Sequence, residues 1–308
     1  MKRAVNRKLP LLLLLSVMLV LAGCSGNRES VPASGGGNSP DTTSSASSPS
    51  ASEPPSQSAD SSASESEASQ QPASSPRLDE IKAKGKLVIA TGDYYPFEYI
   101  DPETKELVGY DIDLGEKIAE KLGVETEWTA MQFTALIPTI QNGQADMSIA
   151  AMYITEERKQ AVDMSEPYMA TGMTLVKRAD DDSINGIEDL NGKKIGVKAG
   201  ATSEAAAREL LEKGYDIEIV SYKDTTDYLL DLQLGRVDAA FNDLLNQLGY
   251  NKQHPDANLV IVGEPFTQAG LGIAVRKGDA ELLELVNAVI RELEESGEAQ
   301  RMYEKWLK

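Results

Sequence analysis

The composition of the chain changes sharply near residue 77, and this break limits which part can fold. Between Ser25 and Pro76 there is no Leu, Ile, Met, Lys or aromatic residue, and Ser, Ala, Pro, Gly, Gln and Glu dominate. Such a segment buries too little apolar surface to offset the entropy lost on ordering. We therefore expect a disordered tether over 24–77 and a folded part over 78–308. That part has about 230 residues, enough for two lobes.

The first 23 residues have the features of an export signal. A basic start, with Lys2, Arg3, Arg7 and Lys8, precedes an apolar run over 9–22. This run is too short to span a bilayer. The Leu-Ala-Gly that precedes Cys24 resembles the lipobox of bacterial lipoproteins, which implies that Cys24 is lipidated and begins the mature chain. An ordinary signal peptide with an unmodified cysteine is the alternative. We expect export and lipid anchoring on the extracellular face of the cell membrane, and the Ser-rich tether favours a Gram-positive bacterium.

Charge and residue usage exclude several classes of function. The chain has 30 Lys and Arg against 49 Asp and Glu, and this acidic balance argues against nucleic acid or anionic lipid surfaces as partners. The single histidine, His254, lies in a Lys-Gln-His-Pro segment typical of a surface turn. With one His and one Cys, neither a Ser-His-Asp site nor a His- or Cys-based metal site is available. We expect a monomer without a cofactor.

Short β-branched runs alternate with helical patterns from residue 86 onward. This alternation predicts an α/β fold with mainly parallel sheets flanked by helices. Strands are expected at 87–91, 126–131, 146–150, 173–177, 194–198, 218–222, 238–242, 259–262 and 272–275. Helices are expected at 110–123, 135–143, 156–162, 203–213, 226–235, 244–252 and 280–307, the last interrupted near Gly297.

One pattern occurs twice, which favours two lobes built on one plan. Residues 137–146 and 228–238 each combine a helix, a stop glycine and an Asp that begins a short strand. Chance similarity of two helix-to-strand turns is the alternative. Ligands of open α/β sheets bind beyond the carboxyl ends of the strands, which are here 150–153 and 242–243. A small ligand is therefore expected in a cleft between the lobes.

Two charged residues near these strand ends suit a zwitterionic ligand. Arg158 is placed in the first turn of a helix, where the helix dipole disfavours a cation, so a ligand carboxylate would explain its position. An ion pair with Glu156, Glu157 or Asp163 is the alternative. Asp243 ends the matching strand of the other lobe and is a natural acceptor for an ammonium group.

A further anion site is possible where a strand ends and a helix begins within 196–203. Backbone N–H groups at such a helix start can bind a carboxylate. The glycines lack the Gly-Lys-Ser/Thr order of a phosphate loop. Plain capping of the helix by Thr202 or Ser203 remains the alternative.

The folded part resembles the family 3 extracellular solute-binding proteins, which deliver amino acids to ABC importers. The resemblance extends over about 78–308 and implies a two-lobed, type II periplasmic-binding-protein-like fold with a hinge and a cleft between the lobes. It also implies an ABC transporter permease as partner and a free amino acid as ligand. Six segments in order carry it, namely 94–99, 109–114, 133–138, 154–158, 163–168 and 235–240.

The resemblance assigns roles to six residues of this chain. Arg158 matches the arginine that binds the ligand α-carboxylate, assisted by backbone N–H near Thr202. Asp243 matches the acceptor of the α-ammonium group, assisted by the carbonyl of Ala151. Tyr94 and Phe133 match the two aromatic residues that lie on either side of the ligand side chain. Simple core packing of these two rings is the alternative.

The chain departs from the family pattern at three positions. Thr91 stands where many relatives carry an Asp that helps bind cationic side chains, and Asp93 is displaced from that position by two residues. Tyr153 replaces a Ser or Thr and would narrow the pocket or add a hydroxyl. Lys198 lies at the pocket edge. If it points inward it disfavours cationic ligands and favours an acidic or amide side chain; if it points to solvent it has no such effect.

The family pattern also implies where the chain crosses between lobes. Crossovers are expected near 170–173 and 266–271, so that lobe 1 comprises 78–171 and 269–308 and lobe 2 comprises 172–268. Two short crossovers form a hinge that closes over a ligand. We expect a binding protein and not an enzyme. A cyclohexadienyl dehydratase-like enzyme and a sensor for a membrane receptor are the alternatives.

Overall fold

Two five-stranded sheets form the framework of the protein. The computed structural model describes residues 76–308, which belong to one compact unit of the chain, 68–308. The first sheet contains, in spatial order, β4 (Glu125–Ala130), β1 (Lys86–Thr91), β5 (Met147–Ser148), β14 (Ala274–Val275) and β6 (Asp163–Met164). The second contains β10 (Ile217–Tyr222), β9 (Lys193–Lys198), β11 (Ala239–Asp243), β8 (Met173–Arg178) and β12 (Leu259–Val262).

In each sheet the first three strands pair in parallel, and the fourth strand runs antiparallel to its neighbours on both sides. β1 pairs in parallel with β4 and β5, and β9 pairs in parallel with β10 and β11. The antiparallel pairs are β14 with β5 and β6, and β8 with β11 and β12. The sheets are therefore mixed, with a parallel half that the alternation of strands and helices predicted.

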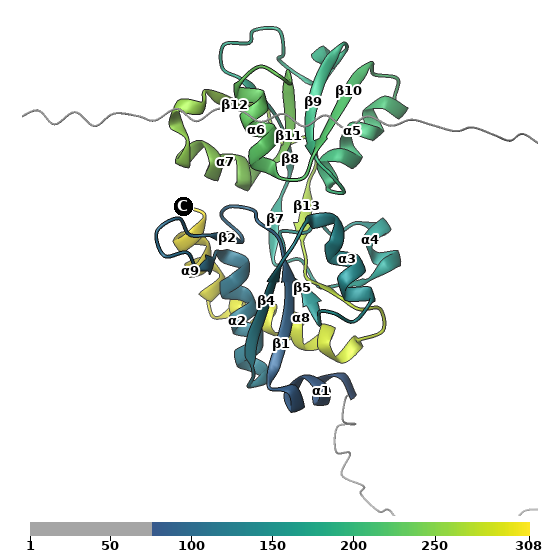
Figure 1. The fold of residues 1–308 in the computed structure, drawn as a ribbon, viewed down its shortest axis with the longest axis vertical. Helices are drawn as coiled ribbons and strands as arrows, with labels where there is room; N and C mark the ends of the chain where they lie inside the picture. The colour runs from purple at the N-terminus through teal and green to yellow at the C-terminus, as the bar shows by residue number, and fades with distance from the viewer. Residues whose placement is uncertain (1–75) are drawn as a thin grey trace, which may run out of the picture. The chain divides into compact units, whose positions relative to one another are not determined.

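Helices cover both sheets and complete two lobes (Figure 1). We call the first sheet with its helices lobe 1 and the second with its helices lobe 2. Lobe 1 contains α1 (Pro76–Lys84), α2 (Tyr110–Leu122), α3 (Phe133–Gln141), α4 (Glu156–Ala161), α8 (Ala280–Glu295) and α9 (Glu298–Trp306). Lobe 2 contains α5 (Thr202–Glu212), α6 (Thr225–Gln233) and α7 (Leu244–Gln253), with two 3-10 turns at Ile187–Leu190 and Pro255–Ala257. None of the described helices is long and apolar enough to cross a membrane.

The sequence pattern of α2 shows why these helices form where they do. Leu114, Ile118 and Leu122 recur at four-residue intervals and are buried against the sheet. The helix ends at Gly123, which adopts the left-handed conformation (φ 73°) that glycine tolerates best. The predicted helices and longer strands are confirmed to within a few residues.

Two short strands join the lobes. β7 (Met169–Thr171) and β13 (Ala269–Leu271) form an antiparallel pair that lies between the two sheets (Figure 1). They overlap the expected crossovers at 170–173 and 266–271. The lobe boundaries of the sequence analysis stay predictions.

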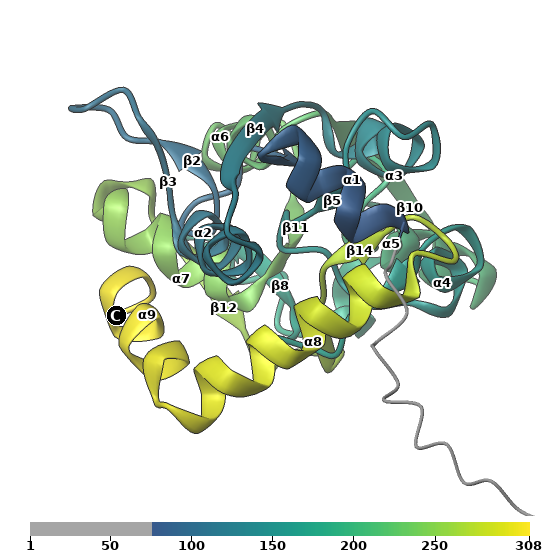
Figure 2. The ribbon, with the colours of Figure 1, turned by 90° about the horizontal axis from the view of Figure 1, so that it is seen from below.

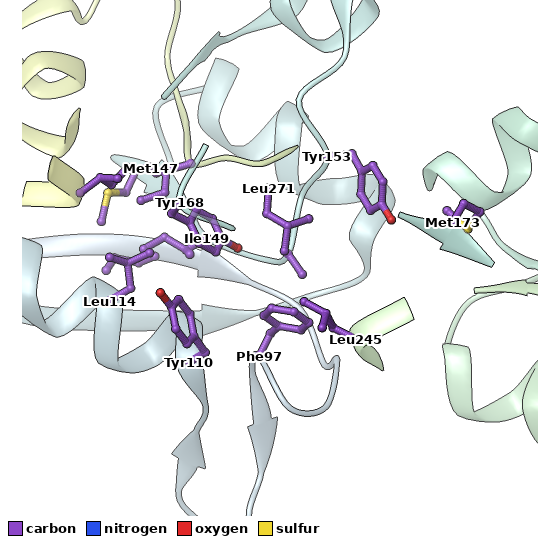
Figure 3. Close-up of a cluster of buried hydrophobic side chains, with 14 of the residues drawn as sticks. Phe97, Tyr110, Leu114, Met147, Ile149, Tyr153, Tyr168, Met173, Leu245 and Leu271 are labelled. Carbon is purple, nitrogen blue, oxygen red and sulfur yellow. The ribbon is translucent and has the colours of Figure 1, made fainter. Parts of the chain in front are cut away.

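A continuous apolar cluster extends from lobe 1 through the connection between the lobes into lobe 2, where it includes Ile195 and Phe241. Phe97 and Leu271 lie at its centre, and Tyr153 extends from it toward Met173, the first residue of β8 (Figure 3). Leu245 of α7 contributes from lobe 2. The core therefore continues to the position where the lobes meet.

The structure adds elements that the sequence analysis did not predict. α1 begins at Pro76, two residues before the expected start of folding, and lies beside α8 (Figure 2). Its Arg77 pairs with Asp146 and Asp279. A two-stranded hairpin joins β2 (Tyr99–Ile100) to β3 (Leu107–Val108). Cys24, the signal segment and the rest of the predicted tether lie outside the described residues.

Candidate functional site

A cavity of about 30 Å³ lies where the carboxyl ends of the strands from both lobes meet. The cavity is small and is lined by residues of both lobes, so we expect the lobes to separate when a ligand as large as an amino acid enters. The predicted site residues that line it are Tyr94, Phe133, Ala151, Tyr153, Arg158, Lys198, Thr202 and Asp243. Ala150, Met173, Ala201, Ser203, Thr225, Tyr228 and Asn242 complete the lining.

Thr91 is the one predicted site residue that the structure does not bring to this cavity. It is fully buried, and its hydroxyl donates a 2.7 Å hydrogen bond to the carbonyl of Ile149. Asp93, two residues later, is exposed and lines a neighbouring hollow with His254. The hydroxyl of Thr91 is therefore hydrogen-bonded to a neighbouring strand segment within lobe 1.

Arg158 reaches the cavity from the first turn of α4. Thr155 caps this helix by accepting a hydrogen bond from the Arg158 backbone N–H. The guanidinium donates to the carbonyls of Tyr153 (2.7 Å) and Gly200 (3.4 Å) and lies 5.2 Å from the centre of the Phe133 ring. Within residues 76–308 it forms no ion pair, although only 8% of Arg158 is exposed.

Burial lowers the pKa of Arg158 to about 10, so its guanidinium stays charged at neutral pH. Of the expected alternative partners, Glu157 acts on Arg158 at longer range and forms no ion pair with it within residues 76–308. Glu156 pairs with Lys159, and Asp163 pairs with Lys277. A buried cation without a counter-charge is costly, and a bound anion relieves that cost.

Asp243 faces the cavity from the end of β11 in lobe 2, where it also caps α7. Its Oδ1 accepts hydrogen bonds from the backbone N–H groups of Leu245 and Asn246. Its Oδ2 accepts from the hydroxyls of Tyr153 (2.6 Å) and Thr171 (2.7 Å). Four donors satisfy the capacity of a carboxylate, so an incoming ammonium must displace one of them.

Separation of the lobes would break the hydrogen bond between Tyr153 and Asp243. The Tyr153 ring comes from lobe 1, and Asp243 comes from lobe 2. Burial is the main cause that raises the pKa of Asp243, and the hydrogen bonds from Tyr153 and Thr171 oppose it. Separation of the lobes exposes the carboxylate to solvent and to a cationic group of a ligand.

Ala151 is held in an unusual backbone conformation beside the cavity. Its φ of 44° lies in the left-handed region that a non-glycine residue rarely adopts. The carboxylate of Asp111 accepts a hydrogen bond from the Ala151 N–H at 2.7 Å and another from the Tyr168 hydroxyl at 3.0 Å. Asp111 therefore fixes the peptide whose carbonyl is the predicted acceptor for a ligand ammonium group.

Asp111 belongs to a buried pair of carboxyl groups. Its neighbour Glu98 is also buried, and the two carboxyl groups repel each other when both are charged, which favours a state in which they share one proton. Burial raises the pKa of Asp111 to about 6 and raises that of Glu98 further above its ordinary value. The pair adds at most one negative charge to the wall of the cavity at neutral pH.

The two predicted aromatic residues both lie against Lys198. The Lys198 Nζ is 4.7 Å from the centre of the Tyr94 ring and 5.2 Å from that of Phe133. Only 6% of Lys198 is exposed, so it points inward. Tyr94 also donates a 3.2 Å hydrogen bond to Asn242, so it contacts lobe 2 as well as the cavity.

The start of α5 carries a free hydroxyl. Ala201 occupies the N-cap position, and Ser203 instead accepts a hydrogen bond from the Lys198 backbone N–H. The buried Oγ1 of Thr202 has no hydrogen-bond partner in the described structure. Side-chain capping by Thr202 or Ser203 is therefore not observed, and Thr202 is available to a ligand.

Several lining residues were not predicted as site residues, and one of them, Asn242, is the centre of a hydrogen-bond network. Its side-chain oxygen accepts hydrogen bonds from the hydroxyls of Tyr94 and Tyr228, and its amide nitrogen donates hydrogen bonds to Asn246 and Gln247. It directly precedes Asp243 at the strand end, which is the signal that could have identified it. Thr225 and Tyr228 lie on α6, and nothing in their local sequence indicates which face of that helix meets the cavity.

The lobes also touch beside the cavity through the loop before α5. Gly200 has φ 70°, and a Cβ there would lie 2.7 Å from the Thr134 side chain of α3. Its carbonyl accepts from Arg158. Asn246 donates to the Tyr95 carbonyl at 2.6 Å farther along the cleft. The described structure is thus a closed arrangement in which the lobes are in direct contact.

The described residues hold no ready metal site. Within 76–308, no group of three or more His, Cys, Asp or Glu side chains is arranged to bind a metal ion. Asp243 is the one carboxylic acid among the residues lining the cavity. The groups that face the cavity are suited to binding charged and polar atoms of a small molecule.

Comparison with known proteins decides the family. Residues 87–308 match the model of the bacterial extracellular solute-binding proteins, family 3. The chain belongs to this family. It is 32% identical over 231 residues to the L-cystine-binding protein TcyJ of Escherichia coli (strain K12), covering 74% of this chain and 85% of the relative.

Solved structures agree with this assignment and with the two-lobed fold. An ancestral arginine-binding protein bound to arginine superposes with a TM-score of 0.69 at 42% identity, covering 73% of this solute-binding protein and 99% of the other chain. The ancestral amino acid-binding protein AncCDT-1, a precursor of cyclohexadienyl dehydratase, has a TM-score of 0.68 at 37% identity, with 75% and 99% covered. The predicted family and fold class are confirmed.

Proposed function

We propose that this solute-binding protein captures a free amino acid in the cleft between its lobes and delivers it to an ABC importer. One observation carries the proposal. The unpaired guanidinium of Arg158 in lobe 1 and the carboxylate of Asp243 in lobe 2 line the same cavity. A zwitterion that binds both groups bridges the lobes and stabilises the closed form.

The remaining lining residues give each part of the ligand a partner. The α-carboxylate binds Arg158 and the free hydroxyl of Thr202. The α-ammonium group binds Asp243, in place of the Tyr153 hydroxyl, and the carbonyl of Ala151. Each charge-assisted hydrogen bond contributes about 1.5–3 kcal/mol net. Tyr94 and Phe133 border the ligand side chain.

Closure is the signal that the importer recognises in this proposal. The paired strands β7 and β13 act as the hinge, and the ligand raises the population of closed molecules. Lipidation of Cys24 holds the protein at the extracellular face of the membrane in this proposal. The lipid anchor and the Gram-positive origin are inferred from sequence.

A ligand screen tests the proposal. Thermal unfolding of the protein is measured with each of the twenty amino acids, cystine and ornithine. A ligand at 100 times its Kd stabilises the folded state by about 2.7 kcal/mol, which raises the unfolding temperature measurably. Absence of a shift with all of them contradicts amino-acid capture.

A dehydratase is the second candidate, because of the similarity to AncCDT-1. Such an enzyme needs a general acid beside the substrate. No Glu or His lines the cavity of the described structure, and Asp243 already accepts four hydrogen bonds. These observations favour binding. Release of an aromatic product from arogenate or prephenate would reverse this preference.

A further inference from the structure

Lys198 places a positive charge where the ligand side chain is expected. Its Nζ lies 4.7 Å from the centre of the Tyr94 ring and 5.2 Å from that of Phe133, the two rings that border the ligand side chain in the proposed function. Such contacts are cation–π interactions, in which an ammonium is attracted to the ring faces. The protein thus supplies its own cation to these two rings.

This ammonium has no direct partner in the part of the chain that the structure describes. No hydrogen bond and no ion pair within 4.0 Å joins the Lys198 Nζ to an acceptor there. Three acids, Glu98, Asp224 and Asp93, act on it at longer range. Of these, Glu98 has a pKa raised well above its ordinary value, mainly by burial, which weakens its charge. Burial lowers the pKa of Lys198, which is the effect expected of an ammonium that lacks a counter-ion.

Two threonines line the same cavity as Lys198. The Oγ1 of Thr202 is buried and has no hydrogen-bond partner in the described structure, and Thr225 lies beside the Tyr228 hydroxyl. Each is the first residue of its helix, so the helix dipole adds positive potential at both positions. The cavity therefore offers two cations and the free hydroxyl of Thr202, while its one carboxylate is saturated by four donors.

We infer that the side chain of the ligand ends in a carboxylate, as in glutamate or aspartate, and that Lys198 determines this specificity. The inference rests on the proposed function, because Arg158 must bind the α-carboxylate for Lys198 to face the side chain. A carboxylate gains charge-assisted hydrogen bonds that are about twice as strong as those of a neutral amide. A cationic side chain would meet a like charge between the same two rings, which disfavours it.

This specificity differs from that of the arginine-bound neighbour described above. Thr91 is consistent with the difference, because its hydroxyl is bonded inside the wall and supplies no negative charge to the cavity. The chain therefore lacks an obvious carboxylate for a guanidinium side chain among the residues that line the cavity.

Calorimetry on the full chain, solubilised in detergent, tests the inference with glutamate, aspartate, glutamine and arginine. We expect the wild type to bind glutamate or aspartate at least tenfold more tightly than glutamine or arginine. Lys198→Met keeps the apolar stem and removes the charge; it should weaken binding of the acidic ligand at least tenfold and change glutamine affinity less than threefold. Lys194→Met, which removes an exposed ammonium from the same strand β9, is the matched control and should change neither.

The outcomes separate this inference from the proposed function. Tighter binding of arginine or glutamine than of both acidic ligands, or an unchanged affinity of Lys198→Met for the acid, overturns the inference and leaves amino-acid capture intact. Absence of binding by all four ligands and by the wider panel overturns both. Retained glutamine binding by Lys198→Met shows that this variant is folded.

Discussion

The hydroxyl of Tyr153 donates a 2.6 Å hydrogen bond to Oδ2 of Asp243 across the cleft. It occupies the position on Asp243 that an ammonium group of the ligand needs, because the other oxygen caps α7. The same bond joins the two lobes, so it stabilises a closed form that a ligand cannot enter. Ligand and Tyr153 therefore compete for one oxygen atom.

Loss of this hydroxyl should tighten ligand binding. In Tyr153→Phe the ring keeps its packing, but the closed form without ligand loses one hydrogen bond to a charged group. Since that form does not admit the ligand, its reduced population raises the apparent affinity, by about tenfold or more for a bond worth about 1.5–3 kcal/mol. Calorimetric Kd values of wild type and variant check this; a weaker affinity would show that Tyr153 binds the ligand directly.

Closure should depend on the absence of a side chain at Gly200. A Cβ at this position would lie 2.7 Å from Thr134 of the opposite lobe. Gly200→Ala should therefore weaken binding about tenfold or more, measured by calorimetry. Gly192→Ala controls for the backbone, because Gly192 also has a positive φ (75°) in lobe 2 but has no atom within 4 Å of the added Cβ. Equal effects of the two variants on affinity would assign the loss to backbone strain.

The buried pair of Glu98 and Asp111 should make stability fall as pH rises. Burial raises the pKa of Asp111 to about 6, so the folded state holds a proton that the unfolded state releases near pH 4. Stability from this pair is fully present below about pH 4 and is lost as pH rises through about 6.

Glu98→Gln tests this pH dependence, because the amide donates to Asp111 without a shared proton. Denaturant unfolding between pH 4 and 7 should show that the difference in free energy of unfolding, variant minus wild type, grows by roughly 1–3 kcal/mol toward pH 7. Glu281→Gln, which removes an acid from an exposed position on α8, is the control and should show no such pH dependence. A constant difference for Glu98→Gln would contradict the shared proton.

Much of the fold follows from local sequence patterns, whereas its short strands do not. Helices such as α2 have apolar residues at regular intervals over several turns and end at a glycine, so the sequence shows where they begin and end. The hinge strands β7 and β13 have three residues each, too few for any periodicity. They exist because the two crossing segments pair with each other, which depends on the tertiary fold.

The candidate site was likewise predicted in part from the sequence. The family pattern placed Arg158 and Asp243 at the ends of elements whose positions in an α/β lobe are constrained, and both line the cavity. The direction of Lys198 was undecided, because the last four residues of β9 are all buried and alternation cannot distinguish cavity from solvent. Thr225 was missed because its exposure to the cavity depends on how α6 packs across β9 and β11.

The most direct measurement is the affinity of Arg158→Ala for the amino acid that the ligand screen identifies. The account predicts a loss of more than tenfold by calorimetry, since a buried guanidinium that binds the α-carboxylate contributes at least 1.4 kcal/mol, about one factor of ten. Lys159→Ala, which removes an exposed ammonium from the same helix, should leave the affinity unchanged. An unchanged affinity of folded Arg158→Ala would contradict the binding of the ligand between Arg158 and Asp243.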